Sequence, residues 1–158
     1  MRTGSGDTGQ QVHANGTVAD AIAAVLKREG VDIVFGYPRN QILEAAARID
    51  IRTIIVRQER TGLHMADAVS RMTKGGKMGV FVMQQGPGAE NAFGGVAQAF
   101  ADCVPVLVMP QGYALGQMHV PFNFNSVRSM ASVSKHAEPL TGADQVVPVL
   151  RRAFTQLR

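Results

Sequence analysis

The stretch TIIVRQERTGLHMADA, residues 53–68, decides the fold of this chain. It opens with an apolar, mostly β-branched run at positions 53–56 and then reaches a carboxylate, Glu59. Apolar side chains follow at helical spacing, with Leu63 and Ala66 on one side. A buried parallel strand that leads into a helix has this pattern.

Glu59 follows the carboxyl end of the predicted strand, where open α/β sheets bind their ligands. Position alone leaves two interpretations open. Glu59 is either a functional carboxylate at a strand end or a solvated acid in the first turn of a helix, where the helix dipole favours negative charge.

Composition limits the class of protein. A chain of 158 residues with 46% hydrophobic and 18% charged residues is long enough for one globular domain with a core. No apolar run is long enough to cross a bilayer, so we expect no membrane partner. The single cysteine, Cys103, excludes an internal disulfide and predicts a reducing, cytoplasmic location. Its apolar neighbours predict that it is a small core residue.

The net charge of +4 does not indicate nucleic-acid binding. The basic residues are scattered, and the chain has two tyrosines and no tryptophan. Proteins that bind nucleic acids usually gather basic residues on one face among aromatic side chains. We therefore expect no nucleic-acid partner.

The order of predicted elements gives the fold class. Residues 1–16 are rich in Gly, Thr and Gln and are predicted to be disordered, so the domain covers 17–158. Within it, strands alternate with helices, which predicts an α/β fold: a three-layer, doubly wound, mostly parallel sheet with helices on both faces. The predicted strands are 31–36, 53–56, 79–83 and 104–109, with 132–137 as a short fifth. The methionines are predicted to pack in the core, among them Met65, Met72, Met83 and Met109.

Three segments at predicted strand ends are candidate sites: residues 36–38, Glu59 with its neighbours, and residues 84–91. The turn Gly86-Pro87-Gly88 resembles a phosphate cradle. The chain has no Gly-x-Gly-x-x-Gly and no Gly-Lys-Ser/Thr, which excludes the dinucleotide and P-loop motifs. The two glycines either let the backbone approach a flat group or are simply turn glycines. The histidines lack the spacing of metal ligands, so we predict no metal site in this chain.

Five segments together resemble the pyrimidine-binding, N-terminal domain of thiamine-diphosphate-dependent enzymes, in the group of acetolactate synthases and 2-oxoacid decarboxylases. Each segment is a weak signal, but the five occur in the family's order and spacing. The resemblance covers about residues 17–157. The segments are Phe35–Pro38, Val56–Arg60, Met65–Asp67, Gly86–Asn91 and Ala101–Val106.

The resemblance implies a role for each matching residue. Glu59 is the expected catalytic residue, which hydrogen-bonds a ring nitrogen of the cofactor's aminopyrimidine and promotes loss of the thiazolium proton. An acid in a dry crevice can exchange a proton with such a nitrogen. The resemblance also implies cofactor contacts in the loop after the first strand and in the turn that opens the fourth helix, namely Gly36, Tyr37, Pro38, Gly86, Pro87, Gly88 and Asn91.

The same resemblance implies partners. The family's site lies between two subunits, so we expect a homodimer or a higher oligomer that acts on a 2-oxoacid. A diphosphate-binding domain, in the same or another chain, holds Mg²⁺ through a Gly-Asp-Gly motif. That motif is absent here, where Gly6-Asp7 is followed by Thr8. The isolated chain is therefore expected to be inactive and to hold neither the diphosphate nor Mg²⁺ well.

Three departures from the family leave the substrate open. Arg39-Asn40 stand where the synthases usually have two glycines, and Gln84-Gln85 stand where they have Thr-Ser. Residues 119–127 do not match the synthases' Phe-Gln-Glu pattern. The family's last strand is also missing, as in a fragment or in a separate small subunit of a split sulfopyruvate- or phosphonopyruvate-type decarboxylase. A catalytically silent relative and a generic α/β small-ligand module are further alternatives.

Overall fold

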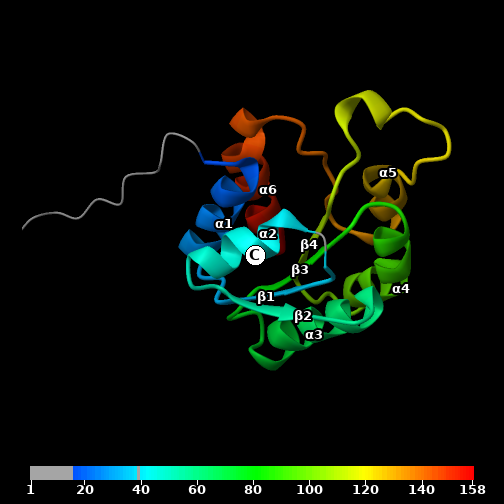
Figure 1. The fold of residues 1–158 in the computed structure, drawn as a ribbon. Helices are drawn as coiled ribbons and strands as arrows, with labels where there is room; N and C mark the ends of the chain where they lie inside the picture. Colours follow the sequence, from blue (N-terminus) through cyan, green and yellow to red (C-terminus); the bar gives the residue numbers. More distant parts are fainter. Residues whose placement is uncertain (1–15, 39) are drawn as a thin grey trace, which may run out of the picture.

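The computed structural model describes residues 16–38 and 40–158. The predicted disordered segment, apart from Gly16, and Arg39 lie outside the described residues. Four parallel strands form one sheet in the order β2-β1-β3-β4 (Figure 1). Their bounds are β1 (Ile33–Gly36), β2 (Arg52–Ile55), β3 (Gly79–Met83) and β4 (Val106–Pro110).

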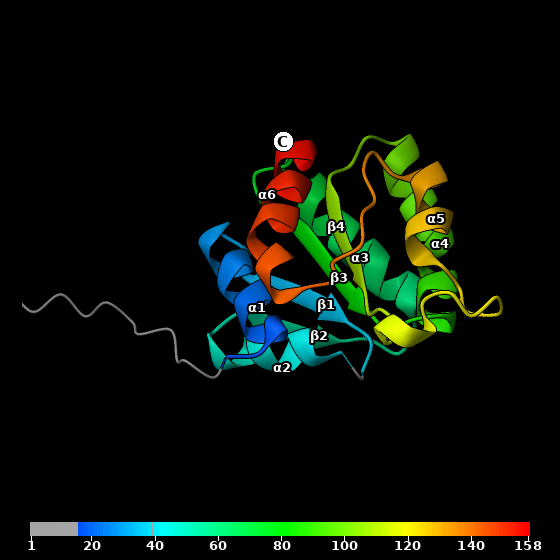
Figure 2. The ribbon, with the colours of Figure 1, turned by 90° about the horizontal axis from the view of Figure 1, so that it is seen from above.

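Helices cover both faces of this sheet, which confirms the predicted three-layer, doubly wound fold (Figure 2). One face carries α1 (Val18–Arg28), α2 (Gln41–Arg48) and α6 (Val146–Leu157). The other carries α3 (Glu59–Met72), α4 (Pro87–Ala101) and the short α5 (Ser126–Met130). Three short 3₁₀ turns complete the described elements: η1 (Leu115–Gln117), η2 (Ala131–Val133) and η3 (Ala143–Gln145).

The central strand β3 divides the core into two layers. Val80 and Val82 face the α1–α2–α6 side, whereas Phe81 and Met83 face the α3–α4 side. All four side chains are fully buried. Successive residues of a strand point to opposite faces, so an unbroken apolar run fills both layers.

Glycines bring α3 and α4 close to each other and to the sheet. A Cβ at Gly95 of α4 would lie 2.6 Å from Leu63 Cδ2 of α3, and a Cβ at Gly62 would lie 2.4 Å from the Phe81 ring. Packing this tight leaves no room for a side chain at either position. The Leu63–Gly95 contact sets the spacing of α3 and α4, and the Gly62–Phe81 contact sets that of α3 and the sheet.

The predicted fifth strand is wrong. Residues 131–133 form η2, and residues 134–142 run without regular structure. Among the described strands, β4 pairs only with β3, so its outer edge has no neighbour. A strand needs a ladder partner for its backbone groups, and the 132–137 segment does not reach one.

Two core predictions are also wrong. Met83 is fully buried and Met109 partly so, but Met65 and Met72 are 38% and 81% exposed on the outer side of α3. Cys103 is exposed as well, because it lies in the turn between α4 and β4 with a φ of 54°. The strand begins at Val106, two residues later than predicted, which leaves Cys103 outside the sheet.

Candidate functional site

Glu59 is the first residue of α3, four positions after the end of β2. The side chain of the N-cap residue Gln58 makes no capping hydrogen bond. Glu59 is the acidic residue of the first turn. Its exposed fraction is only 4%. The first-turn interpretation is therefore right about position, but the carboxylate is not solvated.

Asn91 and Gly88, both from the first turns of α4, meet the Glu59 carboxylate. Asn91 Nδ2 donates a hydrogen bond of 3.1 Å to Glu59 Oε2. The other oxygen, Oε1, lies 3.4 Å from the point that a Cβ on Gly88 would occupy. One carboxylate oxygen is thus held by an amide, while the other lies beside Gly88, where a Cβ would be only 2.7 Å from Gln84 Cγ.

Gly86 begins the turn that carries these residues. It is the N-cap of α4 and has a φ of 62° and a ψ of −117°, a conformation that L side chains rarely adopt. A Cβ there would lie 2.6 Å from the hydroxyl oxygen of Tyr113. Pro87 follows as the first helical residue and is exposed. Tyr113, from the irregular segment after β4, was not predicted as a site residue.

Gly36, Tyr37 and Pro38 end β1 beside the same rim. Gly36 O accepts a hydrogen bond from Val56 N at 3.0 Å, and Tyr37 N donates to Val82 O at 3.1 Å. A Cβ on Gly36 would lie 2.7 Å from both Leu43 Cδ2 and Val82 Cγ2, so packing alone requires glycine there. Pro38 is exposed. Among the described residues, no hydrogen bond joins these three to Glu59.

Gln84, from the predicted segment 84–91, and Asn40, which was not predicted as a site residue, also lie at this rim. Gln84 Cγ is 2.7 Å from the Gly88 Cβ position, and Glu59 Oε1 is 3.4 Å from it. Asn40 is buried and donates to Met83 O at 3.0 Å, while its Oδ1 caps α2 through Ile42 N. In the sequence, both residues were also indicated by the departure from the synthases' pattern at positions 39–40 and 84–85.

Residues 16–132 match the sequence profile of the family described as thiamine pyrophosphate enzyme, N-terminal TPP binding domain, TPP being thiamine diphosphate.

The chain belongs to the thiamine pyrophosphate enzyme family.

Relatives of this TPP-binding domain include the acetolactate synthase large subunit of Haemophilus influenzae, 32% identical over 143 residues, which are 86% of this chain and 24% of that protein. The acetolactate synthase isozyme 3 large subunit of Escherichia coli is 31% identical over 144 residues, again 86% of this chain and 24% of that protein. Acetolactate synthase 2 of Brassica napus is 32% identical over 143 residues, 86% and 22% of the two chains. The chain spans about a quarter of the length of these relatives.

The TPP-enzyme family confirms the resemblance and disfavours a generic α/β ligand module. The residues that meet at the α3–α4 junction also fit an aminopyrimidine. A buried carboxylate can share a proton with a ring nitrogen. Of the site residues proposed from the sequence, Glu59 is hydrogen-bonded to Asn91 and lies beside Gly88, and the remaining five lie at the end of β1 and in the turn after β3.

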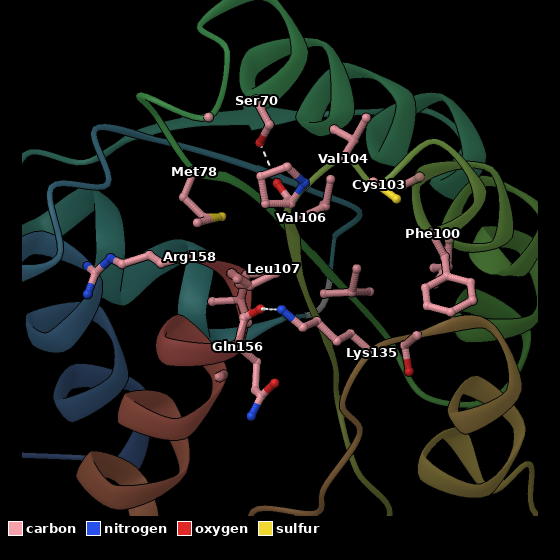
Figure 3. A pocket seen from close by; sticks show the side chains of 18 of the residues that line it. Ser70, Met78, Phe100, Cys103, Val104, Val106, Leu107, Lys135, Gln156 and Arg158 are labelled. Atoms are coloured by element: carbon pink, nitrogen blue, oxygen red, sulfur yellow. Dashed lines mark hydrogen bonds between the residues drawn. The ribbon is translucent and has the colours of Figure 1, made fainter.

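A cavity of about 1060 Å³ in the TPP-binding domain does not contain Glu59, Gly88 or Asn91. It follows the outer edge of β4, between this strand, α6 and residues 133–136 (Figure 3). The Lys135 side chain reaches across it and donates to Gln156 O of α6 at 2.6 Å.

In 16–38 and 40–158, no three His, Cys, Asp or Glu side chains gather as a metal site. None of the helices described is both long and apolar enough to span a bilayer.

Proposed function

We propose that this chain provides the aminopyrimidine-binding half of a cytoplasmic enzyme that decarboxylates a 2-oxoacid and, like the acetolactate synthases it resembles, condenses the product. The observation that carries the proposal is the buried Glu59 carboxylate with Asn91 on one oxygen and Gly88 beside the other. Thiamine diphosphate, when bound, supplies the carbon nucleophile that attacks the oxoacid carbonyl.

The two oxygens of Glu59 have different roles in this proposal. Oε2 accepts the Asn91 hydrogen bond, which fixes the plane of the carboxylate. Oε1 faces the space beside Gly88 and exchanges a proton with a ring nitrogen of the cofactor. A carboxylate that is fixed and shielded from water works as a general acid–base catalyst because its proton partner needs no reorientation.

The surrounding residues bind and position the ring. Gly86, Pro87 and Gly88 form the turn against which the ring lies, and Gly36, Tyr37 and Pro38 border it at the end of β1. The diphosphate and Mg²⁺ are held by a diphosphate-binding domain in the same or another chain, across a homodimer or higher oligomer.

The decisive experiment replaces Glu59 in the assembly of this chain with its diphosphate-binding domain. We expect Glu59→Gln to slow exchange of the cofactor's thiazolium proton with deuterated water, and carbon dioxide release from 2-oxoacids, by about 10²–10⁴-fold. The matched control is Glu44→Gln, which changes an exposed first-turn acid of α2.

The control should leave both rates unchanged. A Glu59→Gln variant that exchanges the proton at the wild-type rate would refute the proposed role. Wild-type protein that releases no carbon dioxide from a broad panel of 2-oxoacids would instead favour a catalytically silent relative.

A further inference from the structure

Asn40 is a buried amide with a hydrogen bond at each end. It is the N-cap residue of α2 and is 6% exposed. Its Oδ1 accepts a hydrogen bond from Ile42 N at 3.0 Å, and its Nδ2 donates one to Met83 O at 3.0 Å. The amide therefore joins the start of α2 to the last residue of β3, 43 positions away in the sequence.

Helix capping accounts for only one of these two hydrogen bonds. A cap needs an acceptor oxygen, which serine and aspartate supply as well as asparagine does. The bond to Met83 O needs an amide donor, which among these three residues only asparagine has. Met83 O also accepts a hydrogen bond from Gln111 N at 2.8 Å, so this carbonyl would not be unpaired without Asn40. The contact is thus required neither by the cap nor by the carbonyl oxygen.

Met83 O is the point where the segments that follow three strands meet. Asn40 follows β1, Met83 ends β3 and Gln111 follows β4. The turn that begins after Met83 leads into α4, where Asn91 holds one oxygen of Glu59. Asn40 thereby fastens the segment after β1 to the strand end from which this turn departs.

Tyr37, earlier in the segment after β1, is attached to the same strand end. Its backbone N–H donates to Val82 O at 3.1 Å, and Val82 directly precedes the residue that Asn40 contacts. The segment after β1 is thus held to two consecutive residues at the end of β3. Residues 36–38 and the 86–88 turn, both proposed to border the ring, are therefore connected through this strand end.

We propose that Asn40 is a positioning residue, whose hydrogen bond to Met83 O sets the spacing between residues 36–38 and the 86–88 turn for the cofactor's aminopyrimidine. This inference rests on the proposed function. Binding is tighter when the groups that contact a ligand are held in place beforehand. Asn40 stands where the synthases usually have glycine, which has no side chain to make this bond, so the resemblance does not imply it.

The test measures the dissociation constant of thiamine diphosphate, with Mg²⁺, on the assembly of this chain with its diphosphate-binding domain. Asn40→Ser keeps an oxygen for the cap and loses the amide donor, so we expect binding about 3–10-fold weaker, which is what one hydrogen bond contributes. Asn40→Asp keeps the shape and the cap but presents an oxygen to Met83 O, so it should weaken binding at least as much. Asn125→Ser is the matched control, because Asn125 is exposed and caps α5 through Arg128 N.

A second measurement separates positioning from general stability. At saturating cofactor, Asn40→Ser should exchange the thiazolium proton within about twofold of the wild-type rate, because it weakens binding while Asn91 still holds Glu59. A merely structural role would lower the midpoint of thermal unfolding of Asn40→Ser and leave the dissociation constant unchanged.

An unchanged dissociation constant in both Asn40 variants overturns the inference, and so does an equal loss of binding in Asn125→Ser. An exchange rate at saturation as low as that of Glu59→Gln would assign Asn40 to the chemistry and also overturn it. Failure of the proposed function is seen separately. A Glu59→Gln variant with the wild-type exchange rate refutes that function alone, whereas wild-type protein that binds no thiamine diphosphate refutes both.

Discussion

Asn91 Nδ2 and Glu59 Oε2 are 3.1 Å apart, and their hydrogen bond joins the first turns of α3 and α4. The two residues are 32 positions apart in the sequence. Each comes from a helix that begins just after a strand of the same sheet, so the parallel topology brings them together. This contact orients the only buried carboxylate of the described residues that lies at the carboxyl rim.

The Asn91 contact predicts a loss of catalysis together with a loss of stability. Asn91→Ala removes a hydrogen bond to a charged group, worth about 1.5–3 kcal/mol, so we expect a rate about 10–100-fold lower. The midpoint of thermal unfolding should also fall, because the buried Glu59 carboxylate loses this hydrogen bond. Gln98→Ala, an exposed change two turns further along α4, serves as the control for rate and stability. A normal rate in Asn91→Ala would remove Asn91 from the site.

Substitution by alanine should change the free energy of unfolding in opposite directions at Gly79 and Gly94. A Cβ on Gly79 would lie 1.9 Å from the backbone oxygen of Ala66, which cannot move without shifting α3. We expect Gly79→Ala to lower the free energy of unfolding by about 1–3 kcal/mol or more. Gly94 has no atom within 4 Å of its Cβ position, so Gly94→Ala should raise it by about 0.5–1 kcal/mol. Urea unfolding of both variants measures the contrast, and equal effects would contradict the packing described.

Replacing Ser70 should lower the free energy of unfolding, because it leaves buried polar groups without hydrogen-bond partners. Its hydroxyl donates to Pro105 O at 2.5 Å and accepts from Gly79 N at 2.7 Å, which ties α3 to the segments entering β3 and β4. Ser70 is fully buried, so Ser70→Ala should cost about 1–3 kcal/mol of unfolding free energy for each group that stays unpaired. Ser132→Ala, an exposed serine that donates to Ser129 O, is the control and should be near neutral.

Asp20 predicts how stability changes in acid. The hydrogen bond from Arg48, followed by those from Thr17, lowers the pKa of Asp20 to about 2. In the unfolded chain an aspartate has a pKa of about 3.9. Because the folded pKa is the lower one, the ionised form stabilises the fold above about pH 4, and this contribution is lost as the pH falls towards 2.

The measurement is the thermal midpoint of wild type and Asp20→Asn between pH 2 and pH 7. The wild type should be the more stable protein at neutral pH, and the gap should close as the pH approaches 2. A gap that persists at pH 2 would show that the carboxylate's charge is not its cause.

Local patterns in the sequence predict the strands and helices, but they do not settle which side chains are buried. The periods of the apolar residues predicted four strands and the helices between them, because burial on both faces imposes a continuous run and burial on one face imposes helical spacing. The same periods misplaced Met65 and Met72, since apolar residues near a helical stripe need not lie in it. Cys103 was misplaced for a related reason. Apolar residues of the turn before β4, such as Val104, resemble those of the strand, so the sequence does not show where the strand begins.

The amino-acid sequence by itself determined the α/β class, the carboxylate at position 59 and the TPP-enzyme family, because these depend on local periodicity and on motif order along the chain. The tertiary structure alone decided that Glu59 is buried, that Asn91 holds one of its oxygens, and that Gln84 and Tyr113 lie at the same turn. Those facts follow from the close approach of α4 to α3 at Gly88 and Gly95 and of α3 to the sheet at Gly62, where a missing side chain allows the contact. The sequence alone does not specify such a contact, because the contact results from the simultaneous packing of segments far apart in the chain.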